Sequence, residues 1–125
     1  MRYTNPSPSE GSGSGSGYNS GTSYVSPYVK MVKDATNSTY NIKYGKAFDR
    51  FFSSPKWRYF KSTTDQHVVE FTGKFSYKNE PAKAKIQFIL DLDDGTFTAS
   101  FLSIDDEAQN RLMLSALIKK VFESY

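Results

Sequence analysis

The stretch His67–Tyr77, HVVEFTGKFSY, decides the fold of this chain, because residues of two kinds alternate along its whole length. Such a period of two is typical of a β-strand that has one buried and one solvent-facing side. The stretch therefore divides into two sets of residues, of which we expect the first to face the core and the second to face water. The first set is His67, Val69, Phe71, Gly73, Phe75 and Tyr77, and the second is Val68, Glu70, Thr72, Lys74 and Ser76.

Further stretches extend this strand into an antiparallel meander. Ala82–Asp91, AKAKIQFILD, alternates in the same way after a turn at Lys78–Pro81. Asp94-Gly95 is a strong hairpin signal, and Phe97, Ala99 and Phe101 alternate with polar residues after it. The shorter alternation in Trp57–Lys61 supplies a fourth strand.

The hydrophobic period changes to that of a helix on both sides of these strands. We predict one helix over Ser26–Thr36 and a second from Tyr44, which ends at Ser53-Ser54-Pro55 and buries a phenylalanine stripe. A C-terminal helix is predicted to start at Asp105–Glu107, with Asp106 as its cap, Gln109 completing a capping box, and an apolar stripe running to Phe122.

The predicted fold class is therefore α+β, with two N-terminal helices, a four-stranded antiparallel meander sheet, and a C-terminal helix packed on the same sheet face. Ser, Gly and Pro occupy 16 of the first 27 positions, so we expect residues 1–26 to be a disordered tail or linker. Residues 27–125 then form a single domain. The alternating run Gly11–Gly17 suits a flexible tether, and it is also the pattern of an engineered linker.

Composition excludes several classes of function. The chain has no cysteine, which excludes a cysteine nucleophile, a thiolate zinc site and a disulfide framework. His67 is the single histidine, so a site with two histidine ligands is excluded as well. No run approaches the roughly 18 apolar residues of a membrane-spanning helix. We expect no cofactor and no metal, and the residues indicate no catalytic group.

Charge is unevenly distributed along the chain. Residues 28–90 hold 12 Lys and Arg against 5 Asp and Glu, whereas residues 91–125 hold 3 against 7. The basic part could attract a nucleic acid, an anionic lipid or an acidic protein. Alternatively, the two parts complement each other within the fold.

The polar side of the predicted sheet is the candidate binding face. With the Phe71 side as core, the opposite side presents a mixed polar surface that includes a lysine cluster. We expect a monomeric, non-enzymatic binding module that recognises a protein or a cell-envelope component through this face. The candidate residues are Glu70, Thr72, Lys74, Lys83, Lys85, Gln87, Thr98 and Ser100.

Two alternatives come from other classes of function. Carboxylates at Asp91–Asp94 and at Asp105–Glu107 could gather into the site of a small hydrolase or metal-dependent enzyme, although turn and cap roles also explain them. Basic and aromatic residues alternate in Lys56–Lys61, KWRYFK, as in single-strand nucleic-acid binders. Nucleic-acid binding is the less favoured alternative, since strand alternation would bury about half of these aromatics and no RNP-type motif is present.

Several short motifs resemble a domain of unknown function. They are YGKAFD at 44–49, PKW at 55–57, VVEFTG at 68–73, IQF at 86–88 and QN at 109–110. Over Tyr40–Phe122 the chain is similar to the C-terminal domain of membrane-anchored or secreted proteins of Gram-positive Firmicutes, where a zinc ribbon or a single transmembrane segment often precedes a low-complexity linker.

This resemblance implies an extracytoplasmic or cell-surface location, and it brings no activity or active-site residue with it. The chain departs from the pattern by lacking the ribbon and the anchor, so a cytoplasmic location stays open. At the level of layout, the predicted fold also resembles β-lactamase inhibitor proteins and outer-membrane assembly lipoproteins, which bind proteins on an exposed sheet face. Fold analogy alone does not assign a function.

Overall fold

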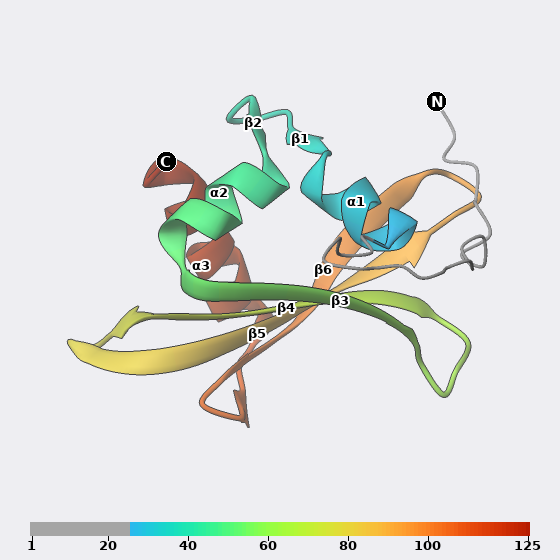
Figure 1. The fold of residues 1–125 in the computed structure, drawn as a ribbon. Helices are drawn as coiled ribbons and strands as arrows, with labels where there is room; N and C mark the ends of the chain where they lie inside the picture. The colour runs from blue at the N-terminus through green and yellow to red at the C-terminus, as the bar shows by residue number, and fades with distance from the viewer. Residues whose placement is uncertain (1–25) are drawn as a thin grey trace, which may run out of the picture.

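The structure is a computed structural model that describes residues 26–125, and its fold is α+β. The five-stranded antiparallel sheet has the order β3-β4-β5-β6-β7, and β1 and β2 form a separate two-stranded sheet. All three helices lie on one side of the larger sheet (Figure 1). In chain order the elements are α1 (Pro27–Lys33), β1 (Thr36–Asn37), β2 (Ile42–Lys43), α2 (Tyr44–Phe51), β3 (Ser53–Lys61), β4 (His67–Tyr77), β5 (Glu80–Asp91), β6 (Thr96–Ile104), β7 (Glu107–Ala108) and α3 (Arg111–Glu123).

The predicted α+β class is confirmed, and the predicted count of four strands is wrong. β7 adds a fifth strand to the meander, and β1 with β2 adds a small hairpin before α2. These extra strands have two residues each. A period of two cannot be recognised over so short a stretch, which is why the alternation did not indicate them.

The start of the C-terminal helix is also corrected. Asp105 and Asp106 have φ angles of 51° and 70° and form the two-residue turn between β6 and β7. Such left-handed pairs suit the right-handed twist of a tight hairpin, and aspartate tolerates them. The cap of α3 is Asn110, whose Oδ1 accepts a hydrogen bond of 2.8 Å from the Met113 N–H.

The predicted turn at Lys78–Pro81 is shorter than expected. Lys78 and Asn79 have φ angles of 54° and 66° and make the whole turn, while Glu80 and Pro81 already belong to β5. The tight turn lets β4 and β5 pair from His67 with Leu90 to Tyr77 with Glu80.

A β-bulge at Ser100 changes which side chains of β6 face the core. Gln87 pairs with Phe101 and Phe88 pairs with Ala99, so Ser100 is an extra residue in the ladder. The expectation that Phe101 shares the core face of Phe97 and Ala99 is therefore wrong. Leu102, which is 1% exposed, faces the core in its place.

The core lies between the helices and the sheet. Phe48 of α2 is fully buried at its centre, and its ring centroid lies 5.1 Å from that of Phe71 on β4 and 5.9 Å from that of Phe88 on β5. Phe122 of α3 reaches the same ring at 6.2 Å. Within residues 26–125, no helix has the length and apolar character needed to cross a membrane. With the helices on this side, the opposite side of the sheet stays uncovered by any described helix (Figure 1).

Candidate functional site: the open face of the sheet

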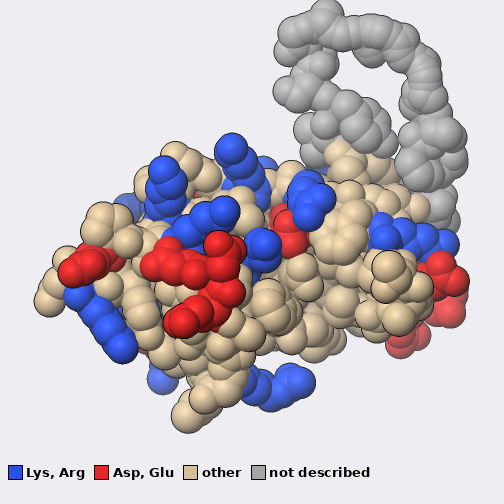
Figure 2. All heavy atoms as spheres, turned by 90° about the horizontal axis from the view of Figure 1, so that it is seen from below, with Lys and Arg blue, Asp and Glu red and all other residues tan. Residues whose placement is uncertain are grey.

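We call the side of the five-stranded sheet opposite the helices the open face. Residues that pair directly across neighbouring antiparallel strands point to the same side, so the register gives its side chains in rows. Figure 2, the view from below, shows basic side chains spread over this side with several acidic groups among them, one of which is a large cluster. The rows are Lys74 and Lys83; then Lys56, Thr72, Lys85 and Ser103; then Arg58, Glu70, Gln87 and Phe101; then Phe60, Val68, Ile89 and Thr98.

The open face thus has a basic end and an apolar end. The expectation that this whole side is exposed to solvent is wrong for Glu70, which is 5% exposed, and for Val68, which is 2% exposed. Its row neighbours Phe60 and Ile89 are half-buried, and they cover Val68 from the two adjacent strands. The polar part of the face is therefore confined to the other end.

A polar hollow of about 260 Å³ lies at the basic end. A bulge in β3 helps to form it, since the register shifts between Ser53 and Lys56 and Ser54 has a φ of 51°. Bulges bend a strand and re-aim its side chains. The residues that line the hollow are Ser54, Lys56, Thr72, Gly73, Lys74 and Lys83.

The ammonium groups of the lysines in the hollow have no ion-pair partner among the described residues, although Asp105 Oδ1 accepts a hydrogen bond of 2.9 Å from the backbone N–H of Lys83. These lysines are Lys56, Lys74 and Lys83. Lys74 and Lys83 are direct cross-strand partners, an arrangement of like charges that destabilises a sheet. Such a concentration of positive charge creates a local electrostatic potential that favours anionic groups.

Glu70 lies beside the hollow and neutralises a different cation. It is 5% exposed, and it accepts hydrogen bonds from Arg58 Nε at 2.7 Å and from Gln87 Nε2 at 2.8 Å. Burial by itself would raise the pKa of Glu70. The two hydrogen bonds and the charges of Arg58 and Lys85 outweigh burial, so the pKa of Glu70 lies below its ordinary value.

The structure brings most of the predicted site residues together. Thr72, Lys74 and Lys83 line the hollow, Lys85 pairs directly with Thr72, and Glu70 and Gln87 occupy the next row. Thr98 and Ser100 do not belong to this group. Thr98 lies in the apolar row, and Ser100 is the bulged residue, whose hydroxyl donates to the Thr98 carbonyl at 3.1 Å.

Two residues of the hollow were missed by reasoning from the sequence. The sequence pattern predicts Ser54 at the end of a helix and Lys56 in a separate segment typical of nucleic-acid binders. The alternation of β3 was too short to assign its two faces, and only its pairing with β4 places Lys56 opposite Thr72.

The aromatic residues of the Lys56–Lys61 segment divide between the two sides of the sheet. Trp57 contacts Phe71 with ring centroids 4.8 Å apart, and Tyr59 stacks on Tyr28 at 4.2 Å, both on the helix side. Phe60 lies on the open face, where the Arg58 guanidinium sits 4.7 Å from its ring centroid. One of the three aromatics therefore shares the open face with the basic residues.

The two groups of carboxylates proposed for an enzyme do not meet. Asp91–Asp94 leads from β5 into β6, and Asp105–Glu107 follows β6. The nine residues of β6 separate them by about 30 Å. No group of three potential metal-binding side chains occurs in the described part of the chain.

The lone histidine has a structural environment. His67 Nδ1 lies 2.8 Å from the hydroxyl of Tyr59, and its ring stacks on Tyr28 at 5.6 Å. Burial and the nearby Tyr28 raise the pKa of Tyr59 above its ordinary value.

In comparisons with known proteins, no protein-family model, no curated protein and no solved structure matches this chain. Its function is therefore argued from the open face itself.

Proposed function

We propose that residues 27–125 form a non-enzymatic, monomeric binding module that recognises an anionic protein or cell-envelope component through the basic end of the open face. The observation that carries this proposal is the hollow lined by Lys56, Lys74 and Lys83, whose ammonium groups form no ion pair with any carboxylate among the described residues. The direct cross-strand pairing of Lys74 with Lys83 supports it as well, because a surface that served only solubility would be expected to avoid direct pairing of like charges.

The lining of the hollow defines the chemistry of the ligand. Its volume of about 260 Å³ accommodates one phosphate, sulfate or carboxylate group, and the hydroxyls of Ser54 and Thr72 can donate hydrogen bonds to it. Lys85 in the next row continues the positive charge along the sheet. A chain with repeated anionic groups fits this arrangement better than a single small anion.

We place the module outside the cytoplasm. The Gly-Ser run Gly11–Gly17 has the composition of a tether, and the motif resemblance around YGKAFD points to anchored or secreted proteins. This location suits a ligand that is a polymer or protein of the cell envelope.

The test is binding of two polyanionic probes, an oligomer of glycerol phosphate and a polyglutamate peptide, by calorimetry at low and moderate salt. We expect Lys74→Glu/Lys83→Glu to bind at least about tenfold more weakly, because the reversal turns an attractive site into a repulsive one. Thermal unfolding should show the variant to be folded.

Lys46→Glu/Lys119→Glu is the matched control, since it makes the same change in net charge at exposed positions on α2 and α3. Its affinity should stay within about twofold of that of the parent. Equal losses in the two double variants, or no binding of either probe, would count against the open face as the binding surface.

Single-stranded nucleic acid is the second candidate ligand, and one observation favours it. Phe60 and Phe101 lie on the open face beside Arg58 and are only half-buried, so they could stack on bases next to phosphate contacts. Steeply salt-dependent binding of a ten-nucleotide oligothymidine that Phe60→Ala abolishes would favour this ligand over the other two probes.

A further inference from the structure

The β4–β5 hairpin extends beyond the strand beside it. Pairing of β3 with β4 stops at Ser53 and Lys74, where the Ser53 hydroxyl donates to the Lys74 carbonyl at 3.4 Å. Phe75, Ser76 and Tyr77 therefore have no strand neighbour on that side among residues 26–125, although they pair with β5 on the other side. The projecting hairpin tip is visible in Figure 1.

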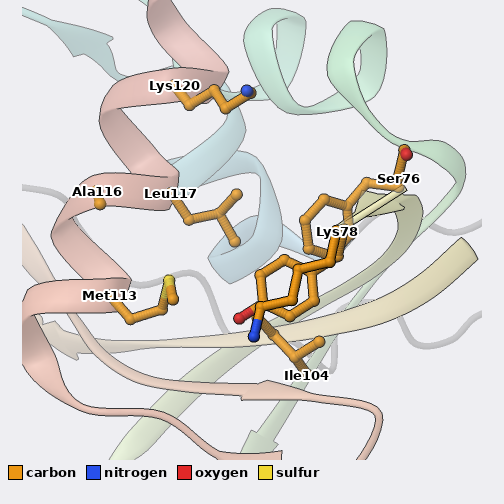
Figure 3. A pocket seen from close by; sticks show the side chains of 9 residues that line it. Ser76, Lys78, Ile104, Met113, Ala116, Leu117 and Lys120 are labelled. Carbon is orange, nitrogen blue, oxygen red and sulfur yellow. The ribbon is translucent and has the colours of Figure 1, made fainter. Parts of the chain in front are cut away.

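Two adjoining cavities lie at this end of the hairpin, on the side of the sheet that the helices cover. The first, of about 500 Å³, lies between Phe51 at the end of α2, the hairpin and Lys120 of α3. The second, of about 250 Å³, runs beneath α3 and is mainly apolar. Met113 and Leu117 project from α3 toward the strands in this second cavity, and Lys120 follows them along the same helix (Figure 3).

The rim of these cavities is basic. Lys78 and Lys120 line both of them, and no carboxylate in the described part of the chain forms an ion pair with either. The Nζ of Lys78 lies 5.2 Å from the ring centroid of Tyr77. An occupant with apolar side chains and a carboxylate would thus complement the surface.

We propose that this edge of β4 binds an extended acidic segment of a partner protein as an additional strand. Main-chain hydrogen bonds to Phe75–Tyr77 would hold the segment in line with β3. Successive side chains of a strand point to opposite sides, so one apolar residue would enter the cavity beneath α3. A neighbouring glutamate or aspartate would reach Lys120 or Lys78.

Charge distinguishes this occupant from two others. A second copy of the chain docked edge to edge would bring Lys78 and Lys120 of both copies together, which is repulsive. Residues 1–25 of the chain contain a single acidic residue, Glu10, and offer little complement to the two lysines.

The test uses a synthetic, end-capped peptide of alternating valine and threonine with a central leucine and two C-terminal glutamates. Titrated into the ¹⁵N-labelled full chain, it should shift the amide signals of Phe75–Asn79 and of Met113 and Leu117. A peptide with lysines in place of the glutamates should bind at least about tenfold more weakly. A peptide N-methylated on the side that pairs should lose binding, because strand addition needs its N–H groups.

Lys120→Glu should weaken binding of the acidic peptide about tenfold, whereas Lys119→Glu, at the neighbouring exposed position outside the cavities, should change it less than about twofold. Equal effects of the two variants, or no shift at Phe75–Asn79 at millimolar peptide, would overturn the proposal. Shifts confined to Thr72, Lys74 and Lys83 would also overturn strand addition at the edge of β4, but they would support anion binding at the open face. The two proposals can therefore fail independently.

Discussion

At the residue scale, Glu70 links the stability of the fold to pH. Its pKa is lowered from the ordinary value of 4.5, so the unfolded chain takes up the proton more readily than the folded one. Its contribution is complete above about pH 5 and is lost as the pH falls through the folded pKa. Glu70→Gln should therefore reduce the difference in free energy of unfolding between pH 7 and pH 3, measured by urea denaturation.

At pH 7 the same variant should lose about 1–2 kcal/mol, because the hydrogen bonds from Arg58 and Gln87 are to a buried carboxylate. Arg58 is largely exposed, so the ion pair itself adds little beyond these hydrogen bonds. Glu80→Gln, at an exposed position in β5, is the control. If both variants respond to acid in the same way, Glu70 does not have the role described.

Gly73 is required by close packing of β4 against Phe52, the residue that follows α2. A Cβ atom at this position would lie 2.7 Å from Phe52 Cβ and 2.8 Å from Phe71 Cζ. Because both neighbours are buried ring-bearing residues, we expect Gly73→Ala to destabilise the protein by about 1–3 kcal/mol. Chemical denaturation measures the free energy of unfolding of Gly73→Ala, with Thr72→Ala as the control. Similar stabilities of the two variants would show that a Cβ atom fits at position 73.

At the element scale, the long strands could be predicted because each repeats its period several times, and α2 could be predicted from aromatic residues at helical spacing through just over two turns. β4, with 11 residues, left no ambiguity about its core face. The positions of the turns could be predicted from the sequence, but their backbone conformations could not. Asp105-Asp106 suits both the first turn of a helix and a left-handed hairpin turn, and the choice depends on β7, which pairs with β6 through two residues only.

The revised start of α3 gives a prediction. Asn110→Ala should destabilise the protein by about 1 kcal/mol, because it removes the acceptor for the Met113 N–H. Asp106→Gly should be neutral or stabilising by a few tenths of a kcal/mol, because glycine adopts its φ of 70° without strain. Thermal melts of both variants measure this. A larger loss for Asp106→Gly than for Asn110→Ala would restore Asp106 as the cap.

At the scale of the whole molecule, alternation predicted the polar side of β4 and of β5, and so predicted the lysines of these two strands. Alternation could not predict which residues of neighbouring strands lie opposite each other. Lys56 lines the hollow because β3 pairs with β4. Ser100 is displaced by a β-bulge, which is recognised only from the pairing of β5 with β6. Sites assembled across strands therefore need the register as well as the pattern.

The central claim is that the basic end of the open face binds an anionic ligand, and a residue-resolved titration tests it most directly. The glycerol phosphate oligomer would be added to the ¹⁵N-labelled chain at low salt, with Lys46 and Lys119 as reference positions on the helix side. We predict that Thr72, Lys74, Lys83 and Lys85 shift first, that added salt reverses the shifts, and that Lys74→Glu/Lys83→Glu abolishes them. Shifts of equal size at Lys46 and Lys119, or none on the open face, would contradict the account.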